Sequence, residues 1–310
     1  MEVSSLAIPG RMKVVAMHEK QPKGSITYRV LRRVLGEVGL TKVWEHISSF
    51  YLWNAFPLNG KDPRLFQVVG IPRSGTTLLC SSLDSHSRII CISEPYHQWK
   101  HNGFVYAEKI LQFDIWKRHP SFLIEQLLKV HKDKMIGFKE TYYSESHGHY
   151  KNYFFFKKNF EKGIKTIVIV RDPREVWKSL VIMHSEKKGK VPDRFLEAWN
   201  DLTEWALRNN IFLIKYESLI SNPVYVLQKV CSYLVVEFEF DMLHLRPKLA
   251  LGDPKALKGG SIVNKSLEFE KFLTKDEILK IERGCFGLMK ALGYKPIQLA
   301  EQYADEADEN

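Results

Sequence analysis

Short apolar runs and segments with helical periodicity alternate along the chain. The apolar runs are brief, rich in β-branched residues and bounded by glycine, proline or charged residues, so they predict strands. These strands cover residues 65–69, 88–92, 134–138, 166–170 and 211–215. Apolar residues at helical spacing predict helices over residues 76–83, 151–162, 195–208, 223–233 and 275–292, and two more on either side of Pro120 within residues 104–131. Strands that alternate with helices predict an α/β fold.

The run Thr-Ile-Val-Ile-Val at residues 166–170 carries apolar side chains on both faces of its strand. Such a strand suits a doubly wound parallel sheet with helices on both faces. No internal repeat or low-complexity linker divides the chain. We therefore expect one main domain at residues 61–298, a helical extension at residues 1–60 that packs on it, and a flexible acidic tail at residues 299–310.

The chain carries an excess of positive charge, with 46 lysine and arginine residues against 36 acidic residues and a net charge of +10. A basic enzyme commonly meets an anionic partner, but charge alone leaves nucleotide, nucleic acid, acidic glycan and membrane surface open. No apolar run is long enough to cross a bilayer and no signal-like segment is evident, so we expect a cytoplasmic protein. The spacing of cysteine and histidine residues predicts no metal site.

The loop after the first predicted strand has the form of a phosphate-binding loop. Gly70 and Gly75 frame it with the G-x-x-x-x-G spacing of a P-loop. Backbone N–H groups at the start of the next helix point toward an anion there, and the helix dipole adds positive potential. Thr76 occupies the position of the usual P-loop lysine, and the cation of this loop is Arg73. A P-loop kinase or NTPase would lack its phosphate-bridging lysine, yet it stays open as an alternative.

A second candidate phosphate site follows the fourth predicted strand. Asp172 is placed to cap the next helix and Pro173 to begin it, which leaves Arg171 at the carboxyl end of the strand. Open parallel sheets bind ligands at that edge. Arg171 offers a bidentate fork to a phosphate, and Ser179 adds a hydroxyl about two turns along the helix. Taken alone, the pattern is equally consistent with an arginine that pairs with a nearby acid.

The two loops together resemble those of the sulfotransferases that use 3′-phosphoadenosine 5′-phosphosulfate (PAPS). Pro-Arg-Ser-Gly-Thr-Thr-Leu at residues 72–78 resembles their sulfate-donor loop, in the arginine form of the carbohydrate and tyrosylprotein sulfotransferases. Val-Arg-Asp-Pro at residues 170–173, with Ser179, resembles their 3′-phosphate site. The segments at residues 215–219 and 292–294 are similar to two further family segments.

This resemblance implies a P-loop-like fold, PAPS as co-substrate, adenosine 3′,5′-bisphosphate (PAP) as product, and no required metal. It also implies a set of cofactor-binding residues, which comprises Arg73, Ser74, Gly75, Thr76, Thr77, Arg171, Ser179, Tyr216, Lys258 and Gly259. The partner it implies is a hydroxyl-bearing acceptor and not a nucleic acid. The arginine form of the donor loop favours a glycan or glycolipid, with tyrosine in a peptide as the alternative.

Three residues are candidates for the chemistry of sulfuryl transfer. Arg73 lies in the donor loop, where its permanent charge would stabilise the leaving group. Glu94 follows the second predicted strand and resembles the catalytic glutamate of the tyrosylprotein enzymes, with His97 as a competing base. Lys139, at the end of the third predicted strand, resembles a family lysine that reaches the sulfuryl group, although pairing with Glu140 in solvent is the alternative. A nucleotide-binding module without catalysis also remains open.

Overall fold

The computed structural model describes residues 58, 60–97, 119–245, 260–262 and 268–297, and strands and helices alternate in them as the hydrophobic pattern predicts. All of these residues lie in the unit His46–Asn310. The expected acidic tail, nearly all of the expected N-terminal extension, and the segment with Lys258 and Gly259 lie outside the described residues.

The described strands form a five-stranded parallel sheet and a small antiparallel pair. The large sheet consists of β1 (Leu65–Gly70), β2 (Ile89–Ser93), β3 (Met135–Thr141), β4 (Lys165–Val170) and β5 (Phe212–Lys215). Its order is β2-β3-β1-β4-β5, and every neighbouring pair is parallel. The small pair joins β6 (His244–Leu245) to β7 (Gly260–Ser261). The parallel order confirms the predicted doubly wound sheet.

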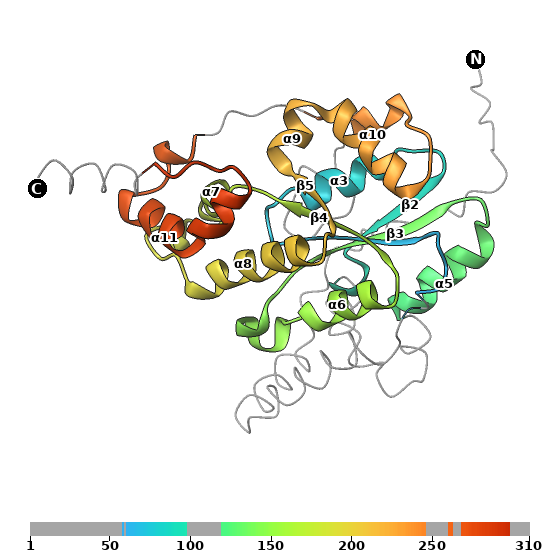
Figure 1. Cartoon of the computed structure of the whole chain (residues 1–310), viewed down its shortest axis with the longest axis horizontal. Coiled ribbons are helices and arrows are strands. Elements are labelled where there is room, and N and C mark those ends of the chain that lie inside the picture. Colours follow the sequence, from blue (N-terminus) through green and yellow to red (C-terminus); the bar gives the residue numbers. More distant parts are fainter. Residues whose placement is uncertain (1–57, 59, 98–118, 246–259, 263–267, 298–310) are drawn as a thin grey trace, which may run out of the picture. The chain divides into compact units, whose positions relative to one another are not determined.

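Helices cover both faces of the large sheet (Figure 1). One face carries α3 (Thr76–Leu83), α9 (Tyr216–Ser221) and α10 (Pro223–Leu234). The other face carries α5 (Pro120–Val130), α6 (Tyr153–Glu161) and α8 (Asp193–Arg208). Beyond them α7 (Pro173–Met183) and α11 (Lys275–Ala291) lie together, joined by a hydrogen bond of 2.9 Å from Trp177 to Glu277.

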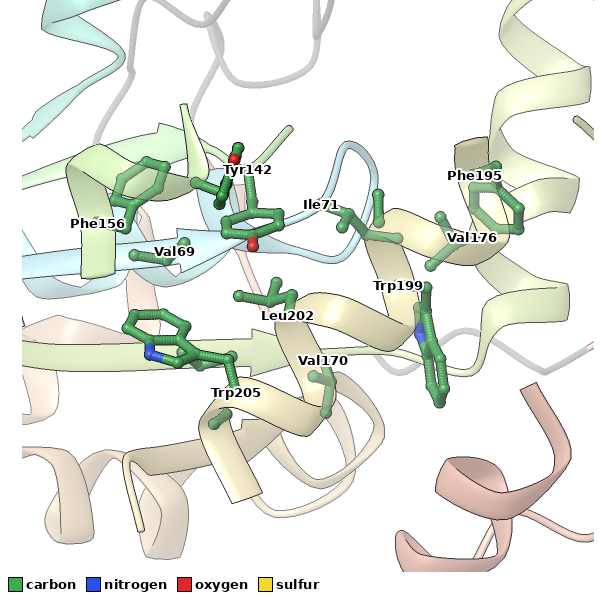
Figure 2. Packing of buried hydrophobic residues seen from close by; sticks show 14 of the residues in the cluster. Val69, Ile71, Tyr142, Phe156, Val170, Val176, Phe195, Trp199, Leu202 and Trp205 are labelled. Carbon is green, nitrogen blue, oxygen red and sulfur yellow. The ribbon is translucent and has the colours of Figure 1, made fainter. Parts of the chain in front are cut away.

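Two hydrophobic cores lie on the two faces of the sheet. Along β4 the side chains alternate between them, because successive residues of a strand face opposite sides. Ile167 and Ile169 belong to the core with α3 and α10, whereas Val168 and Val170 belong to the core with α6 and α8. Figure 2 shows part of the latter core, in which Trp205 of α8 lies beside the sheet. Both faces of β4 are therefore buried, as its sequence predicts.

The strand order brings the two candidate phosphate sites to one edge. β1 lies in the middle of the sheet; the connection through α3 leads from β1 to β2 on one side, and the connection through α6 leads from β3 past β1 to β4 on the other. Doubly wound sheets bind ligands at the carboxyl ends of the strands around such a reversal. The donor loop follows β1 and Arg171 follows β4, so both begin at this edge.

β3 runs further than the hydrophobic pattern predicts. It continues past Phe138 to Thr141, which places Lys139 inside the strand and corrects the expectation that this lysine ends it. The apolar pattern stops early because residues 139–141 are polar, yet all three are buried, at 2, 0 and 7% exposure. Buried polar groups require partners. This end of β3 is therefore a polar site inside the fold.

Candidate active site

The donor loop is a tight turn between β1 and α3. Ser74 donates to the carbonyl of Ile71 from its N–H at 3.2 Å and from its hydroxyl at 2.8 Å. Arg73 and Gly75 both have positive φ angles, of 70° and 98°. A Cβ atom added to Gly75 would lie 2.4 Å from the ring of Tyr216. Both the backbone conformation and the close ring therefore require glycine at residue 75.

The loop leads into the first turn of α3, which begins at Thr76. The first N–H groups of a helix have no acceptor within the helix. In α3 no side chain caps them, and no acidic residue lies in the first turn. Together with the hydroxyls of Thr76 and Thr77, these N–H groups form a set of donors that suits a phosphate or sulfate. The residues present thus fit the anionic group that the sequence predicts.

The second candidate phosphate site lies against the first. The Nε of Arg73 donates to the hydroxyl of Ser179 at 3.0 Å. Arg171 donates to the carbonyl of Arg73 at 3.2 Å, and its guanidinium lies 4.4 Å from the centre of the Tyr216 ring. The fold therefore brings these four predicted residues into one cluster, although they come from three separate parts of the chain.

Sequence reasoning places Glu175 in the first turn of the helix but does not identify it as the partner of Arg171; it is a fully buried carboxylate of α7. It accepts hydrogen bonds from Arg171 at 2.9 Å and from Lys178 at 2.8 Å, so Arg171 does pair with a nearby acid. The guanidinium nevertheless keeps donor capacity, because its Nε is buried and has no hydrogen-bond partner among the described residues. A buried donor that lacks a partner, next to a candidate anion site, is what a bound anion would require as its hydrogen-bond donor. The spacing of four residues between Arg171 and Glu175 is the sequence signal for this pair.

Glu94 follows β2 directly and is buried, with 6% of its surface exposed. Its carboxylate pairs with the ammonium of Lys139 and accepts from the hydroxyl of Thr141 at 3.1 Å. Its N–H donates to the carbonyl of Lys139 at 2.6 Å. The alternative of a solvent-exposed lysine paired with Glu140 is wrong, because the register of β2 on β3 sets Ser93 beside Lys139 and brings Glu94 to its ammonium.

This pair changes the acid–base chemistry of Glu94. Burial alone raises the pKa of a carboxyl group. The charge and hydrogen bond of Lys139 outweigh burial, with help from His97 and the Thr141 hydroxyl, and hold the pKa of Glu94 below its ordinary value of 4.5. Glu94 also has a φ angle of 50°; Arg73 and Glu94 are two of the four non-glycine residues with positive φ in the described part of the chain. Residues with this backbone conformation are concentrated at functional sites.

The competing base, His97, pairs with a different buried carboxylate. Its Nδ1 contacts Glu140, and its ring centre lies 5.5 Å from that of Tyr143. Sequence reasoning missed this role of Glu140, because a polar run at a strand end gives no sign of which side is buried. Glu94 and His97 therefore lie near each other, each with its own charged partner.

Lys258 and Gly259 fall outside the described residues, so their place in the site stays a prediction. Within the described residues, no three potential metal ligands come together. The helices in the same part of the chain include none with both the length and the apolar character that a membrane crossing requires.

Comparison with protein-family models decides to which family these features belong. The family model described as "Sulfotransferase domain" matches residues 63–287, well over half of the 310-residue chain. The chain belongs to this sulfotransferase family. The matched range begins just before β1 and includes the donor loop, Arg171 and the Glu94–Lys139 pair. The expected enzyme class is thereby confirmed, and the kinase or NTPase alternative is set aside.

Three solved structures are similar to this sulfotransferase. The sulfotransferase domain from the curacin biosynthetic pathway is 18% identical, with a TM-score of 0.48, over 75% of this chain and 98% of that chain. The domain from the Synechococcus PCC 7002 olefin synthase is 16% identical, with a TM-score of 0.48, over 74% and 95%. Mouse sulfotransferase SULT7A1 complexed with PAP is 14% identical, with a TM-score of 0.48, over 84% and 95%. The curated protein sequences gave no match.

Proposed function

We propose that this sulfotransferase moves a sulfuryl group from PAPS to a hydroxyl group of a glycan or glycolipid. The observation that carries the proposal is the single cluster of Arg73, Arg171, Ser179 and Tyr216 beside the uncapped start of α3. The cluster offers two adjacent sets of anion donors. PAPS differs from ordinary adenine nucleotides in carrying a 3′-phosphate besides its 5′-phosphosulfate, so a two-part anion site suits it.

The donor loop is proposed to hold the 5′-phosphosulfate through the N–H groups at the start of α3 and the hydroxyls of Thr76 and Thr77. Arg171 and Ser179 hold the 3′-phosphate through charge-assisted hydrogen bonds. Tyr216 packs on the guanidinium of Arg171 and keeps it oriented toward the loop. Ser74 and Gly75 shape the loop, and Lys258 and Gly259 complete the proposed cofactor site.

The reaction needs a base at the acceptor and cations at the donor. The acceptor oxygen bonds to sulfur, the bond from sulfur to the bridging oxygen of the 5′-phosphate breaks, and PAP leaves with the electron pair. Glu94 takes the proton of the acceptor hydroxyl. Arg73 stabilises the charge that develops on the bridging oxygen, since a guanidinium is a permanent charge and a poor proton donor.

Lys139 is proposed to act on both the base at the acceptor and the sulfuryl group of the donor. In the structure its ammonium pairs with Glu94 and lowers the pKa of that residue. When Lys139 turns toward the sulfuryl oxygens, Glu94 loses that cation and becomes a stronger base. The donor loop and Lys139 come from neighbouring strands, because Gly70 at the end of β1 is the register partner of Thr141 on β3. We prefer Glu94 to His97 as the base because Lys139, which is proposed to reach the sulfuryl oxygens, contacts Glu94 directly.

A transfer assay tests this function and its acceptor. The full chain is incubated with radiolabelled PAPS and a panel of desulfated glycans, glycolipids and tyrosine-containing peptides. We expect label in a glycan or glycolipid, with release of an equal amount of PAP. Arg73→Ala should lose the transfer. Arg208→Ala, which removes an exposed arginine of α8 paired with Glu204, is the matched control and should keep it.

Two results would overturn different parts of the proposal. Label that enters only the peptides contradicts the glycan or glycolipid acceptor and favours tyrosine. A protein that releases no PAP from PAPS with any acceptor, water included, contradicts sulfuryl transfer itself and leaves a nucleotide-binding module.

A further inference from the structure

The polar end of β3 divides its side chains between two partners. Lys139 and Thr141 both contact the carboxylate of Glu94, whereas Glu140 contacts the turn that follows Glu94. This division follows from the strand, in which neighbouring residues face opposite sides. The proposed reaction uses Lys139 and Glu94. It leaves Glu140, a carboxylate with 0% exposure, without a role.

Glu140 contacts the turn at residues 94–97, which consists of the bend at Glu94 and the helical residues 95–97, at three points. Its Oε1 accepts from the N–H of Tyr96 at 2.6 Å and, at a longer distance of 3.4 Å, from the N–H of His97. Its Oε2 contacts the Nδ1 of the His97 ring. A fully buried carboxylate needs donors of this kind to offset its lost hydration. Glu140 on β3 therefore holds the turn both through backbone N–H groups of the turn and through the side chain of His97.

The turn needs such a tie because Glu94 has a φ angle of 50°. A non-glycine residue stays in this region only where its surroundings hold it there. On one side of the turn, the N–H of Glu94 donates to the carbonyl of Lys139 at 2.6 Å. On the other side, the fully buried ring of Tyr96 packs 5.7 Å from that of Phe138. Between these two contacts, the turn is held by its hydrogen bonds to Glu140.

We propose that Glu140 is a positioning residue for Glu94, the proposed base, and for His97, the competing candidate beside it. Through the N–H of Tyr96 it fixes the turn that directs Glu94 toward Lys139. Through Nδ1 it fixes the ring of His97 and its tautomer, because a carboxylate acceptor keeps the proton on Nδ1 and leaves the electron pair on Nε2. This inference rests on the proposed sulfuryl transfer, and it assigns a residue that contacts neither donor nor acceptor.

Glu140→Gln separates positioning from simple stability. The amide keeps an oxygen for the N–H of Tyr96 but presents an NH₂ group to the ring of His97. Nδ1 must then accept, so the ring proton moves to Nε2. The matched control is Glu282→Gln, which changes another fully buried carboxylate, on α11, that pairs with Arg174.

Three quantities are measured for the wild type and both variants: affinity for PAP, the rate of PAPS hydrolysis with water as acceptor, and the imidazole nitrogen NMR signals of His97. His97→Gln assigns those signals. We expect Glu140→Gln to bind PAP like the wild type, to show the altered tautomer, and to hydrolyse PAPS about 10- to 100-fold more slowly, a smaller loss than the roughly 10²- to 10⁴-fold contribution of a general base, because the base itself remains. Glu282→Gln should leave the rate and the His97 signals unchanged.

Unchanged His97 signals in Glu140→Gln, or a hydrolysis rate equal to that of Glu282→Gln, overturn the inference. Failure of the wild type to bind PAP overturns the proposed function instead, so the two failures are distinguishable. If Glu140→Gln does not fold, Glu140→Asp is measured, because it keeps the charge but retracts the carboxylate by one methylene. A slower rate with unchanged PAP affinity supports the inference, and a wild-type rate overturns it.

Discussion

At the scale of single residues, several charged side chains of the site are buried in oppositely charged pairs. Glu94 pairs with Lys139, and Arg171 pairs with Glu175. Removal of one member leaves the other charge buried without its counterion, which costs more than replacement of both. These pairs therefore hold charged groups at the edge of the sheet, where sulfuryl transfer is proposed to need them.

Lys139→Met is expected to lower the free energy of unfolding by about 3–5 kcal/mol at neutral pH, because it removes the cation from a buried carboxylate. The double variant Lys139→Met/Glu94→Gln should recover most of this loss. The pair lowers the pKa of Glu94, so its stabilising effect is present above the ordinary value of 4.5 and is lost as pH falls through the lowered pKa. Urea unfolding at neutral and acidic pH measures both effects. A double variant as unstable as the single one would contradict the pairing.

The sequence singles out the residue types of this site but not their partners. Glu94 and Lys139 are recognisable because each comes at or near the end of a predicted strand, within a family-like segment. Their pairing depends on the register between β2 and β3, which links positions far apart in the chain. Glu140 is missed for the same reason, because its partner His97 lies on a turn from another strand.

Elements differ in how well the sequence predicts their ends. α7 begins as Asp172-Pro173 predicts, since the side chain of Asp172 accepts the N–H of Arg174 at 2.9 Å and Pro173 is the first helical residue. α3 has the bounds that its pattern predicts, Thr76–Leu83. The end of β3 is missed because its last three residues are polar and buried, a combination that hydropathy alone reads as a loop.

Gly75→Ala tests the donor loop as an element. Gly75 and Gly293 both have positive φ angles, 98° and 73°, so alanine at either position incurs left-handed strain of roughly 1–2 kcal/mol. A Cβ on Gly75 would also lie 2.4 Å from the ring of Tyr216, whereas one on Gly293 meets nothing within 4 Å. We expect Gly75→Ala to be the less stable variant and to lose PAP affinity through displacement of Tyr216 and of Arg171 stacked on it.

Thermal unfolding and PAP titration of the two glycine variants measure this difference. Gly293→Ala controls for the backbone strain and should bind PAP like the wild type. Equal losses of PAP affinity in both variants would show that Tyr216 does not depend on the shape of the loop.

The whole molecule depends on a strand order that the hydrophobic pattern does not contain. β1 and β4 are neighbours, so the donor loop and Arg171 meet although β2 and β3 separate them in the sequence. The pattern predicts parallel strands with covered faces, but buried strands are too alike to reveal their order. Only the resemblance to sulfotransferases predicted that the two loops form one nucleotide site, and the contact between Arg171 and Arg73 supports that prediction.

Calorimetric titration with PAP, with AMP and Mg-ATP as comparisons, tests the proposed nucleotide site most directly. PAP and AMP differ in the 3′-phosphate, which Arg171 is proposed to bind. Loss of hydrogen bonds to a charged group costs about 1.5–3 kcal/mol, so Arg171→Ala should weaken PAP binding roughly 10- to 100-fold. Lys178→Ala is the matched control, because it removes the other cation that pairs with Glu175.

We predict that the wild type prefers PAP to both other nucleotides, that Arg171→Ala loses this preference, and that Lys178→Ala keeps it. Equal affinity for PAP and AMP, a preference for Mg-ATP, or an Arg171→Ala variant that binds PAP like the wild type would contradict a 3′-phosphate site at Arg171 and the use of PAPS that depends on it.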